Sequence, residues 1–289
     1  MTTATGYRRH IEDCTRHDPA NFAPFLIDGQ PFGWINPENA ALIVAASGAF
    51  ARQAGGVVLD PALRDFESRS AALAQAATAL TKHYGMKLRK EMYPVLHWWG
   101  DTPLAQIDRA AVPWFGVRGF GVHVNGFVRQ PDGLHLWIAQ RAMDRKVDPG
   151  KLDNTIAGGQ PIGLSLEENL AKEAWEEAGV EAPLAATARF ASTISYKVEK
   201  MRGMRNDALF VYDLEFPPDF TPRNTDGEVS GFTLMPMAEA AALVRDTDRF
   251  KFNCNLVMID FLLRHGFFKD EADELRQAMQ PLNARPTGS

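Results

Sequence analysis

The chain has 289 residues, of which 45% are hydrophobic and 23% are charged, and its formal net charge is −5. This length favours two domains, and this composition is typical of an ordinary globular protein and excludes a disordered or fibrous chain. The acidic balance argues against a general nucleic-acid-binding protein, and no stretch approaches the roughly 18 apolar residues of a membrane-spanning helix.

The two cysteines, Cys14 and Cys254, are far apart and lack the spacing of zinc ligands. The sequence therefore predicts neither a disulfide scaffold nor a zinc site. The first residues, MTTATGYRRHIEDC, contain no apolar core of a signal peptide. We expect a cytoplasmic protein that binds neither nucleic acid nor membrane; a leader removed ahead of this sequence is the alternative.

Residues 1–112 are predicted to form a small α+β domain. The segment Phe25 to Ile35, FLIDGQPFGWI, indicates two short strands about an Asp-Gly turn. Phe66 to Tyr84 is an alanine-rich segment that predicts a helix ended by Gly85. The pattern changes near residue 112, so a second domain is predicted over residues 113–289.

The second domain is predicted to begin with a β-hairpin. From Gly119, GFGVHVNGFVRQ alternates as a strand does, PDG makes a turn, and LHLWIAQRA alternates again. A polar, glycine-rich loop is expected over residues 148–163, and further strands over residues 190–196 and 209–216. Between those strands we expect a basic loop with Lys197, Lys200, Arg202 and Arg205.

The C-terminal part is predicted to contain one well-marked helix. Asn253 is placed to cap the segment NLVMIDFLLR, and Gly266 is placed to end it. We expect this helix to pack on the sheet. The final residues, ARPTGS, are typical of a frayed terminus.

The segment GGQPIGLSLEENLAKEAWEEAGV, residues 158–180, has a well-marked helix at its centre. Ser165 followed by Glu168 is the spacing of a capping box, which fixes the start of a helix. Gly179 stands where a helix ends in a left-handed residue. These signals predict a helix of three to four turns between them.

Three carboxylates share one face of this helix. Glu173, Glu176 and Glu177 are three and four residues apart or adjacent, so they repel one another unless a cation lies between them. Magnesium, which prefers oxygen ligands, would remove that repulsion. Taken alone, this spacing is more often a solvated acidic face paired with lysines. The opposite stripe, suited to packing on a sheet, holds Leu166, Leu170, Ala174 and Ala178.

The same segment resembles the Nudix box, Gx5Ex7REUxEExGU, which fits without gaps from Gly158 to Val180. Gly159 follows the first glycine. Two positions depart from the motif: Leu164 stands in place of the first Glu, and Lys172 stands in place of Arg. Losing both residues together suggests that the loop and helix are packed through apolar contacts there. Lysine also lacks the planar group with which arginine makes two parallel hydrogen bonds. The matching positions are Gly158, Glu173, Ala174, Glu176, Glu177, Gly179 and Val180.

The resemblance extends over nearly the whole chain. The segments GVHVNGFV, PGKLDNTIAGGQPIG, NTDGEVSGFTLMP and FNCNLVMIDFLLRHG are similar to the Nudix family associated with thiamine pyrophosphokinase. FAPFLIDGQPFGWI resembles the start of the extra N-terminal region of that family. The resemblance implies an α+β protein, with a Nudix α/β/α sandwich of mixed sheet after a small α+β N-terminal domain. It implies no kinase domain after residue 270.

The resemblance also implies a metal-dependent hydrolase. In this family a metal-activated water attacks one phosphorus of a diphosphate. Glu173 and Glu177 correspond to Mg²⁺ ligands, with Mn²⁺ as the alternative ion, and Glu176 to a third ligand or a water bridge. Glu173 and Glu228 are the candidates for the general base. Glu228, in DGEV, is equally well explained as an ordinary turn residue.

Several residues are candidates for contact with the substrate, and each has a structural alternative. Asp153 and Asn154 either orient the substrate or make a turn. Tyr196 either stacks on a flat ring or packs in the core, and His123 is expected to be structural. One or two of four basic residues are expected to pair with the diphosphate and the others to be solvated: Arg141, Arg145, Lys146 and Lys151.

The implied activity is hydrolysis of thiamine diphosphate, or of its oxidised analogues such as oxythiamine and oxothiamine diphosphate, to the monophosphate and phosphate. One alternative is an ADP-ribose or dinucleotide pyrophosphatase. A second is a catalytically weakened Nudix ligand-binding module, which only Leu164 and Lys172 support. A third, isomerisation of an allylic diphosphate, lacks a well-placed cysteine. The N-terminal domain is expected to cover the site, to recognise the organic ring or to mediate a homodimer.

Overall fold

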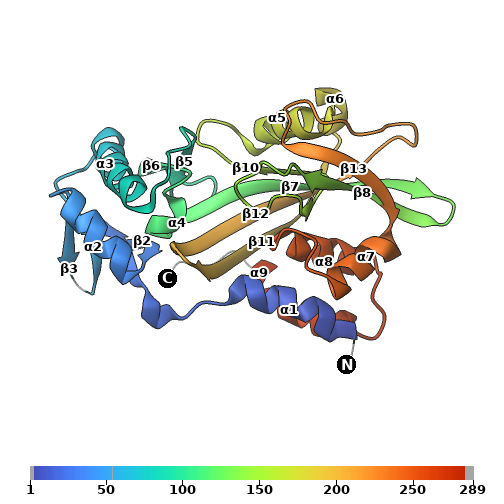
Figure 1. Ribbon diagram of the computed structural model, residues 1–289, viewed down its shortest axis with the longest axis horizontal. Coiled ribbons are helices and arrows are strands. Elements are labelled where there is room, and N and C mark those ends of the chain that lie inside the picture. Colours follow the sequence, from blue (N-terminus) through green and yellow to red (C-terminus); the bar gives the residue numbers. More distant parts are fainter. Residues whose placement is uncertain (1–2, 54, 284–289) are drawn as a thin grey trace.

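The computed structural model describes residues 3–53 and 55–283. A small mixed α and β unit, shown in blue and cyan, lies at one end of a large central sheet (Figure 1). Helices cover both faces of that sheet. The α+β class and the α/β/α sandwich implied by the sequence are therefore confirmed.

The N-terminal unit is built on a four-stranded sheet in the order β2-β1-β4-β3. Asp28 and Gly29, at the turn between β1 and β2, both have positive φ, of 51° and 76°, as the predicted Asp-Gly hairpin requires. The predicted helix is α3, and it ends at Gly85 with φ of 61°. The elements are a 3-10 turn at Pro19–Asn21, β1 (Ala23–Ile27), β2 (Gln30–Ile35), α2 (Pro37–Ala46), β3 (Phe50–Gln53), β4 (Gly56–Leu59) and α3 (Phe66–Tyr84).

A second, two-stranded sheet and a short helix join this unit to the central sheet. They are β5 (Met92–Val95), β6 (Ala105–Asp108) and α4 (Val112–Phe115). Gly116 follows α4 with φ of 59°, and a Cβ there would lie 2.1 Å from the carbonyl oxygen of Trp34 on β2. Only glycine permits this close approach, which holds α4 against the N-terminal sheet.

The central sheet has the order β11-β12-β7-β8-β13, with β10 paired to β7 and β9 paired to β8. The sheet is mixed, because β7 and β12 run parallel whereas the other pairs are antiparallel. The strands are β7 (Arg118–Gln130), β8 (Gly133–Arg141), β9 (Leu152–Asp153), β10 (Ile156–Gly159), β11 (Arg189–Lys200), β12 (Gly203–Glu215) and β13 (Val229–Pro236).

Two loop predictions from the sequence are wrong, because both segments contain strands. The expected loop over residues 148–163 contains β9 and β10, whose backbone groups pair with β8 and β7. The expected basic loop is the end of a long hairpin, because β11 runs to Lys200 and β12 starts at Gly203. Val198 and Met204 are buried, whereas the neighbouring Lys197 and Arg205 are half-buried, so the charged side chains masked the alternation of a strand.

The helices form two layers on the sheet (Figure 1). One layer packs through Leu170 and Ala174 against Val122 and Val124 of β7, and it consists of α5 (Leu166–Ala178) and α6 (Ala182–Ala185). The other layer covers the opposite face, and it consists of α1 (Thr3–Thr15), α7 (Met237–Asp246), α8 (Cys254–Arg264) and α9 (Ala272–Asn283).

The helix α8 is the helix that the sequence predicted after Asn253. It packs on the sheet as expected, and Gly266 follows it with φ of 67°. The side chain of Asn253, however, makes no capping hydrogen bond. The segment ARPTGS lies outside the described residues. Within the described chain, none of the helices combines the length and apolar character that a membrane crossing requires.

The first helix packs on the far part of the chain. Tyr7, Ile11 and Cys14 of α1 are buried in the core formed by α7, α8, α9 and β11. The Tyr7 hydroxyl donates to the carbonyl oxygen of Ala241 at 3.1 Å, and its ring packs edge-on against Phe268. The rest of the N-terminal unit has a separate core, from Phe25 to Val117. The chain therefore crosses the central sheet domain before it enters the N-terminal unit.

Candidate active site

The helix α5 carries the acidic residues, and both of its ends are as predicted. The Ser165 hydroxyl accepts from the Glu168 amide at 3.1 Å, and the Glu168 carboxylate accepts from the Ser165 amide at 2.8 Å. The helix ends at Gly179 with φ of 62°. Because these two ends fix the phase of the helix, Glu173 and Glu177 lie one turn apart on the side that meets β10.

Glu177 is a buried carboxyl group, with 7% of its surface exposed. It accepts a hydrogen bond from the Ala157 amide at 2.7 Å, and it forms no ion pair with any described residue. Burial, followed by the charges of Glu173 and Asp153, raises the pKa of Glu177 to about 8. A buried carboxyl without a cationic partner is costly to ionise, so this position favours a proton or a bound cation.

Glu173 lies against the glycine that opens the motif. A Cβ on Gly158 would be 2.2 Å from the Glu173 carboxyl carbon, so only glycine leaves room for this carboxylate. Burial raises the pKa of Glu173, while the neighbouring Lys172 ammonium lowers it. Gly158 thus creates the space into which this acidic side chain projects.

Lys172 occupies the place where the motif has arginine. Its ammonium donates to Glu176 at 2.6 Å and to Glu173 at 3.1 Å. Glu173 and Glu177 line a cavity beside the helix, whereas Glu176 does not. The structure therefore brings two of the three predicted carboxylates together and pairs the third with lysine.

The pair of inward-facing carboxylates fits a hard divalent cation. Glu177 uses one oxygen for the Ala157 amide, so its other oxygen remains available. Magnesium is commonly held by one or two carboxylates, with waters and substrate phosphates as the other ligands. Glu173 and Glu177 could supply the two carboxylate ligands.

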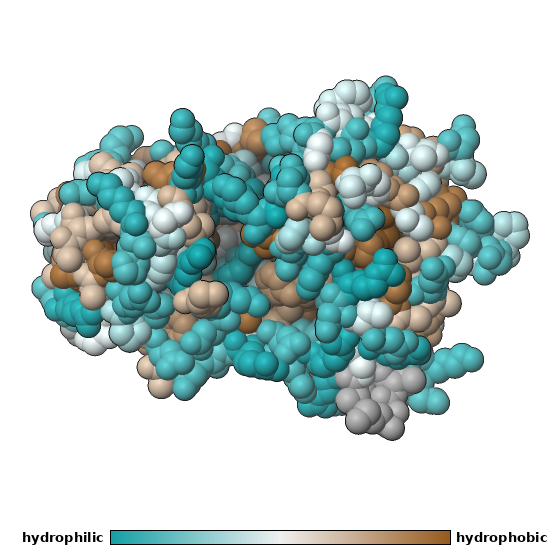
Figure 2. Space-filling view, viewed as in Figure 1, coloured by the Kyte–Doolittle hydropathy of each residue, from teal (hydrophilic) through white to brown (hydrophobic). Residues whose placement is uncertain are grey.

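A cavity of about 260 Å³ lies in front of these carboxylates, between the N-terminal unit and the central sheet. The surface is hollowed there and hydrophilic side chains surround the hollow (Figure 2). Glycines 119 and 121 of β7 form part of its floor with Leu209 of β12. Its cationic lining consists of Arg89, Arg109, Arg141, Arg145, Lys146, Arg205 and Lys251.

The N-terminal unit forms one wall of the cavity. A Cβ on Gly159 would lie 1.7 Å from the Tyr93 hydroxyl oxygen and 3.1 Å from the Arg109 guanidinium carbon. The Ile162 amide also donates to the carbonyl oxygen of Met92 at 2.9 Å. This unit therefore covers the site, which is one of the three roles considered for it.

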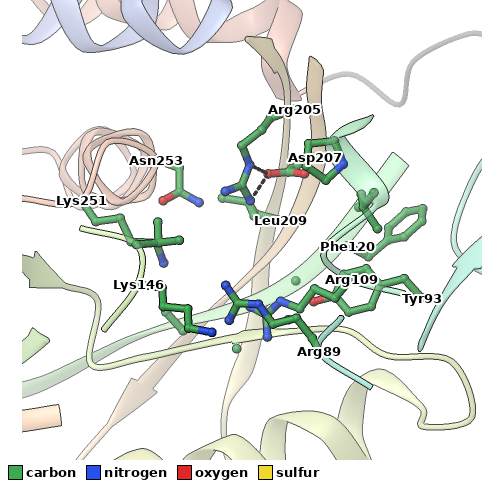
Figure 3. A pocket seen from close by; sticks show the side chains of 18 of the residues that line it. Arg89, Tyr93, Arg109, Phe120, Lys146, Arg205, Asp207, Leu209, Lys251 and Asn253 are labelled. Atoms are coloured by element: carbon green, nitrogen blue, oxygen red, sulfur yellow. Dashed lines mark hydrogen bonds and ion pairs between the residues drawn. The ribbon is translucent and has the colours of Figure 1, made fainter. Parts of the chain in front are cut away.

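The cations from the central sheet domain are held in different ways. Arg141 and Lys251 pair with Asp153, at 2.8 and 3.3 Å. Arg145 forms an ion pair with Glu228, and both line the cavity. Lys146 forms no ion pair within the described chain, and Figure 3 shows it pointing into the cavity from the side opposite Asp207.

A polar group on β12 forms another part of the lining. Asp207 accepts from Arg205 at 2.9 Å (Figure 3). It also accepts from the Tyr196 hydroxyl at 2.7 Å. Tyr196 itself is 3% exposed, belongs to the core beneath the helices and does not line the cavity. Of the two alternatives given for Tyr196, the structure shows packing in the core, where its ring is covered by protein.

His123, Asp153 and Cys254 form a buried cluster whose ligand atoms lie within 4.8 Å of one another. The Cys254 thiol donates to Asp153 at 2.6 Å. Burial would raise the pKa of Asp153, but Lys251, His123 and Arg141 lower it to about 2. The pKa of His123 falls to about 4 through burial and the Lys251 charge. Because two cations already neutralise Asp153, this cluster is poorly suited to a metal ion.

The other predicted substrate contacts lie away from the cavity. Asp153 and Asn154 are buried and do not line it; Asn154 hydrogen-bonds His123 and Asn125. Lys151 lies 3.9 Å from Asp148 and is also outside the lining. In this structure the three side chains therefore contact other protein groups, and their contact with a substrate stays a prediction. Lys172 and Gly179 likewise support α5 from outside the cavity.

Sequence reasoning missed part of the lining, namely Arg89, Tyr93, Arg109, Asp207, Lys251 and Asn253. Asn253 lies in a segment that resembles the family, where it was predicted to cap a helix, and the other five lie in no motif. Those on the N-terminal unit reach the site only through its packing against β10, for which the sequence carries no local signal. Asp207 belongs to the strand that the sequence predicted as a basic loop.

Two family models match the chain. Residues 6–119 match a domain of unknown function, DUF4743. Residues 119–255 match the NUDIX domain. The second match covers the strands β7 and β10, the helix α5 and the start of α8.

Relatives are similar over almost the full chain. Nudix hydrolase 20, chloroplastic, of Arabidopsis thaliana is 37% identical over 97% of this chain and 78% of its own. Nudix hydrolase 24, chloroplastic, of the same plant is 39% identical over 93% of this chain and 75% of its own. A crystal structure of a Deinococcus radiodurans protein is 25% identical, covering 65% of this chain and 99% of that chain, with a TM-score of 0.42.

Proposed function

The chain belongs to the Nudix hydrolase family, and from that membership we propose that this pyrophosphohydrolase cleaves thiamine diphosphate or an oxidised analogue to the monophosphate and phosphate. The observation that supports the site is Glu177, buried without a cationic partner beside Glu173 in a cavity lined by arginines and lysines. Carboxylates and cations in one cavity suit a metal-bound polyphosphate.

Glu173 and Glu177 are proposed to hold Mg²⁺, with Mn²⁺ as the alternative. The metal, when bound, supplies a water of lowered pKa and neutralises charge on the phosphate oxygens. Glu177 is oriented by the Ala157 amide, and Glu173 by the space over Gly158. A ligand role for Glu176 would require its carboxylate to leave Lys172.

Two carboxylates are candidates for the group that takes the proton from water. Glu173 lies beside the proposed metal position, and Glu228 reaches the cavity from the start of β13, where Arg145 holds it. The structure supports Glu228 as more than a turn residue, because its carboxylate lines the cavity. Arg141 and Lys146 also line it and are proposed to face the diphosphate.

The lining also bears on the organic part of the substrate. Tyr93, Phe120 and Leu209 offer an aromatic and apolar surface for a ring. A thiazolium ring carries a positive charge, which the surrounding arginines and lysines disfavour. An oxidised analogue with a neutral ring, such as oxothiamine diphosphate, therefore fits the charge of this cavity better than thiamine diphosphate.

A panel of diphosphates tests the proposal. Thiamine, oxythiamine and oxothiamine diphosphates, ADP-ribose and NADH are incubated with the full chain and Mg²⁺, and products are separated by chromatography. We expect turnover of a thiamine-type diphosphate, a loss of several powers of ten in Glu177→Gln, and little change in Glu167→Gln, an exposed residue of the same helix. Turnover of ADP-ribose or NADH alone would favour the alternative pyrophosphatase activity. Tight binding without turnover would favour a ligand-binding module.

We also propose three further properties predicted from the sequence. They are a domain boundary between residues 112 and 113, a cytoplasmic location and a homodimer. Light scattering on the purified chain measures the last of these, and a homodimer would have about twice the mass of the 32.0 kDa chain.

A further inference from the structure

The cavity has a cationic wall that does not come from the Nudix domain. Arg89 and Arg109 both lie in the N-terminal unit, and both line the cavity that contains Glu173 and Glu177. Figure 3 shows them beside Tyr93, and shows Lys146 extending toward them from the left of the view. Two parts of the chain thus present cations to one cavity.

A single buried carboxylate places both arginines. Asp108, at the end of β6, is 5% exposed. It accepts from the backbone amides of Arg89, Lys90 and Ala110 at 3.0, 2.7 and 2.9 Å. Because Arg109 lies between Asp108 and Ala110, these bonds hold the backbone at both arginines and fix where their side chains start.

Arg109 is held with part of its guanidinium group available. One of its terminal nitrogens donates to Glu91 at 2.8 Å, and its amide donates to the carbonyl oxygen of Glu91 at 2.8 Å. A guanidinium carries five N–H donors, so this contact leaves donors for a ligand. Its carbon lies close to Gly159, next to the glycine over which Glu173 projects.

Arg89 and Lys146 have no acidic partner in the described residues. The lining of the cavity holds seven arginines and lysines and four carboxylates, so positive charge is in excess and favours binding of an anion. Arginine side chains bind phosphate oxygens with two parallel hydrogen bonds, and the several cations of this cavity match the multiple negative charges of a diphosphate.

We propose that Arg89 and Arg109 bind the diphosphate oxygens from the N-terminal side, opposite Lys146, so that both parts of the chain build the substrate site. The inference rests on the proposed function, which makes the ligand a diphosphate. It assigns a binding role to the DUF4743 region, and it makes Asp108 a positioning residue for both arginines.

Binding of methylenediphosphonate, a diphosphate that cannot be hydrolysed, tests the proposal without turnover. Calorimetric titrations in Mg²⁺ compare the full chain with Arg89→Gln, Arg109→Gln and Arg64→Gln. Arg64 is an exposed arginine of the same unit that does not line the cavity. We expect affinity to fall by about 10- to 100-fold for each of the first two variants and to stay unchanged for the third.

Equal affinity of wild type, Arg89→Gln and Arg109→Gln would overturn the proposal, and so would an equal loss in Arg64→Gln. If Arg109→Gln lowers thermal stability, Arg109→Lys is used in its place, because lysine keeps the positive charge but lacks the bidentate guanidinium group. Wild-type affinity in both Arg89→Gln and Arg109→Lys would also overturn the proposal. The diphosphate panel separates the two proposals. Hydrolysis with unaffected variants contradicts only the arginine assignment, whereas weakened binding without hydrolysis contradicts only the proposed activity.

Discussion

Glu177 combines burial, a backbone amide donor and the absence of any ion pair with a described residue. Its pKa, raised to about 8 by burial and the neighbouring Glu173 and Asp153, means that the metal-free side chain holds a proton at neutral pH. A cation that binds this carboxylate must displace that proton. The same residue therefore links metal affinity to pH.

We expect Mg²⁺ affinity to rise about tenfold per pH unit up to about pH 8 and then to level off. Calorimetry in buffers of different ionisation enthalpy should detect release of about one proton below that pH. Glu177→Gln should remove the proton release. Metal binding that is equally tight at pH 6 and pH 8.5 would contradict this linkage.

The raised pKa also affects the stability of the metal-free protein. Between the ordinary value of 4.5 and about 8, the folded chain holds a proton that the unfolded chain has lost. The free energy of unfolding should therefore decrease as the pH rises through this window. We expect metal-free Glu177→Gln to gain in melting temperature over wild type at pH 8, and to gain less at pH 5. Equal differences at the two pH values would contradict the prediction.

Gly158 offers a test of steric control at the site. A Cβ there would lie 2.2 Å from the Glu173 carboxyl carbon, so Gly158→Ala should displace that carboxylate. We expect activity to fall by at least about tenfold, because small misplacements of reacting groups are costly. Gly231→Ala is the matched control, since nothing lies within 4 Å of its Cβ position. Equal activities of the two variants would contradict the steric role.

The spacing of the glutamates predicted which helix face is acidic, but it did not predict which carboxylates reach the cavity. Glu176 and Glu177 are adjacent, and their different surroundings come from the packing of α5 on β10 and from Lys172. Tyr196 shows the same limit. An aromatic residue on a strand has the same sequence pattern whether helices cover its face or a cavity opens there.

Helices whose ends are marked by capping residues were predicted with the correct boundaries. The helix α5 starts at a capping box and ends at Gly179, and α3 ends at Gly85, because each end is specified by a local hydrogen bond or by a left-handed residue. The strands β9 and β10 were missed. They are short, polar or glycine-rich, and the pairing that makes them strands is supplied by β8 and β7.

Removing the cap of α5 should therefore have a measurable cost. Ser165→Ala loses the acceptor for the Glu168 amide, and we expect the free energy of unfolding to fall by about 1 kcal/mol. Chemical denaturation measures the change, with Glu167→Gln as a control on the same turn. An effect no larger than that of the control would show that the cap contributes little.

At the scale of the whole molecule, α1 ties the start of the chain to its C-terminal helices. Tyr7 is 1% exposed between α7 and α9 and donates to Ala241. We expect Tyr7→Ala to lower the free energy of unfolding by about 3 to 5 kcal/mol, and Tyr7→Phe by about 1 kcal/mol. Similar stability of the alanine variant and wild type would contradict this packing role.

The position of the N-terminal unit over the cavity was not predictable from the chain alone. Tyr93 and Arg109 contact Gly159 although neither lies in a recognisable motif, and this contact depends on the sheet domain, the unit and the turn at Gly116 folding together. The sequence predicted the two folds separately, because each has local patterns, and left their junction open. Part of the cavity lining lies at that junction.

We propose that Glu173 and Glu177 hold the catalytic cation in front of the arginine-lined cavity. Anomalous diffraction from crystals grown with Mn²⁺ and methylenediphosphonate tests it most directly. We predict a manganese peak bonded to the carboxylates of Glu173 and Glu177, with the diphosphonate between the peak and Arg109. A peak at the buried cluster of His123, Asp153 and Cys254, or a diphosphonate bound without any manganese near Glu177, would contradict the claim.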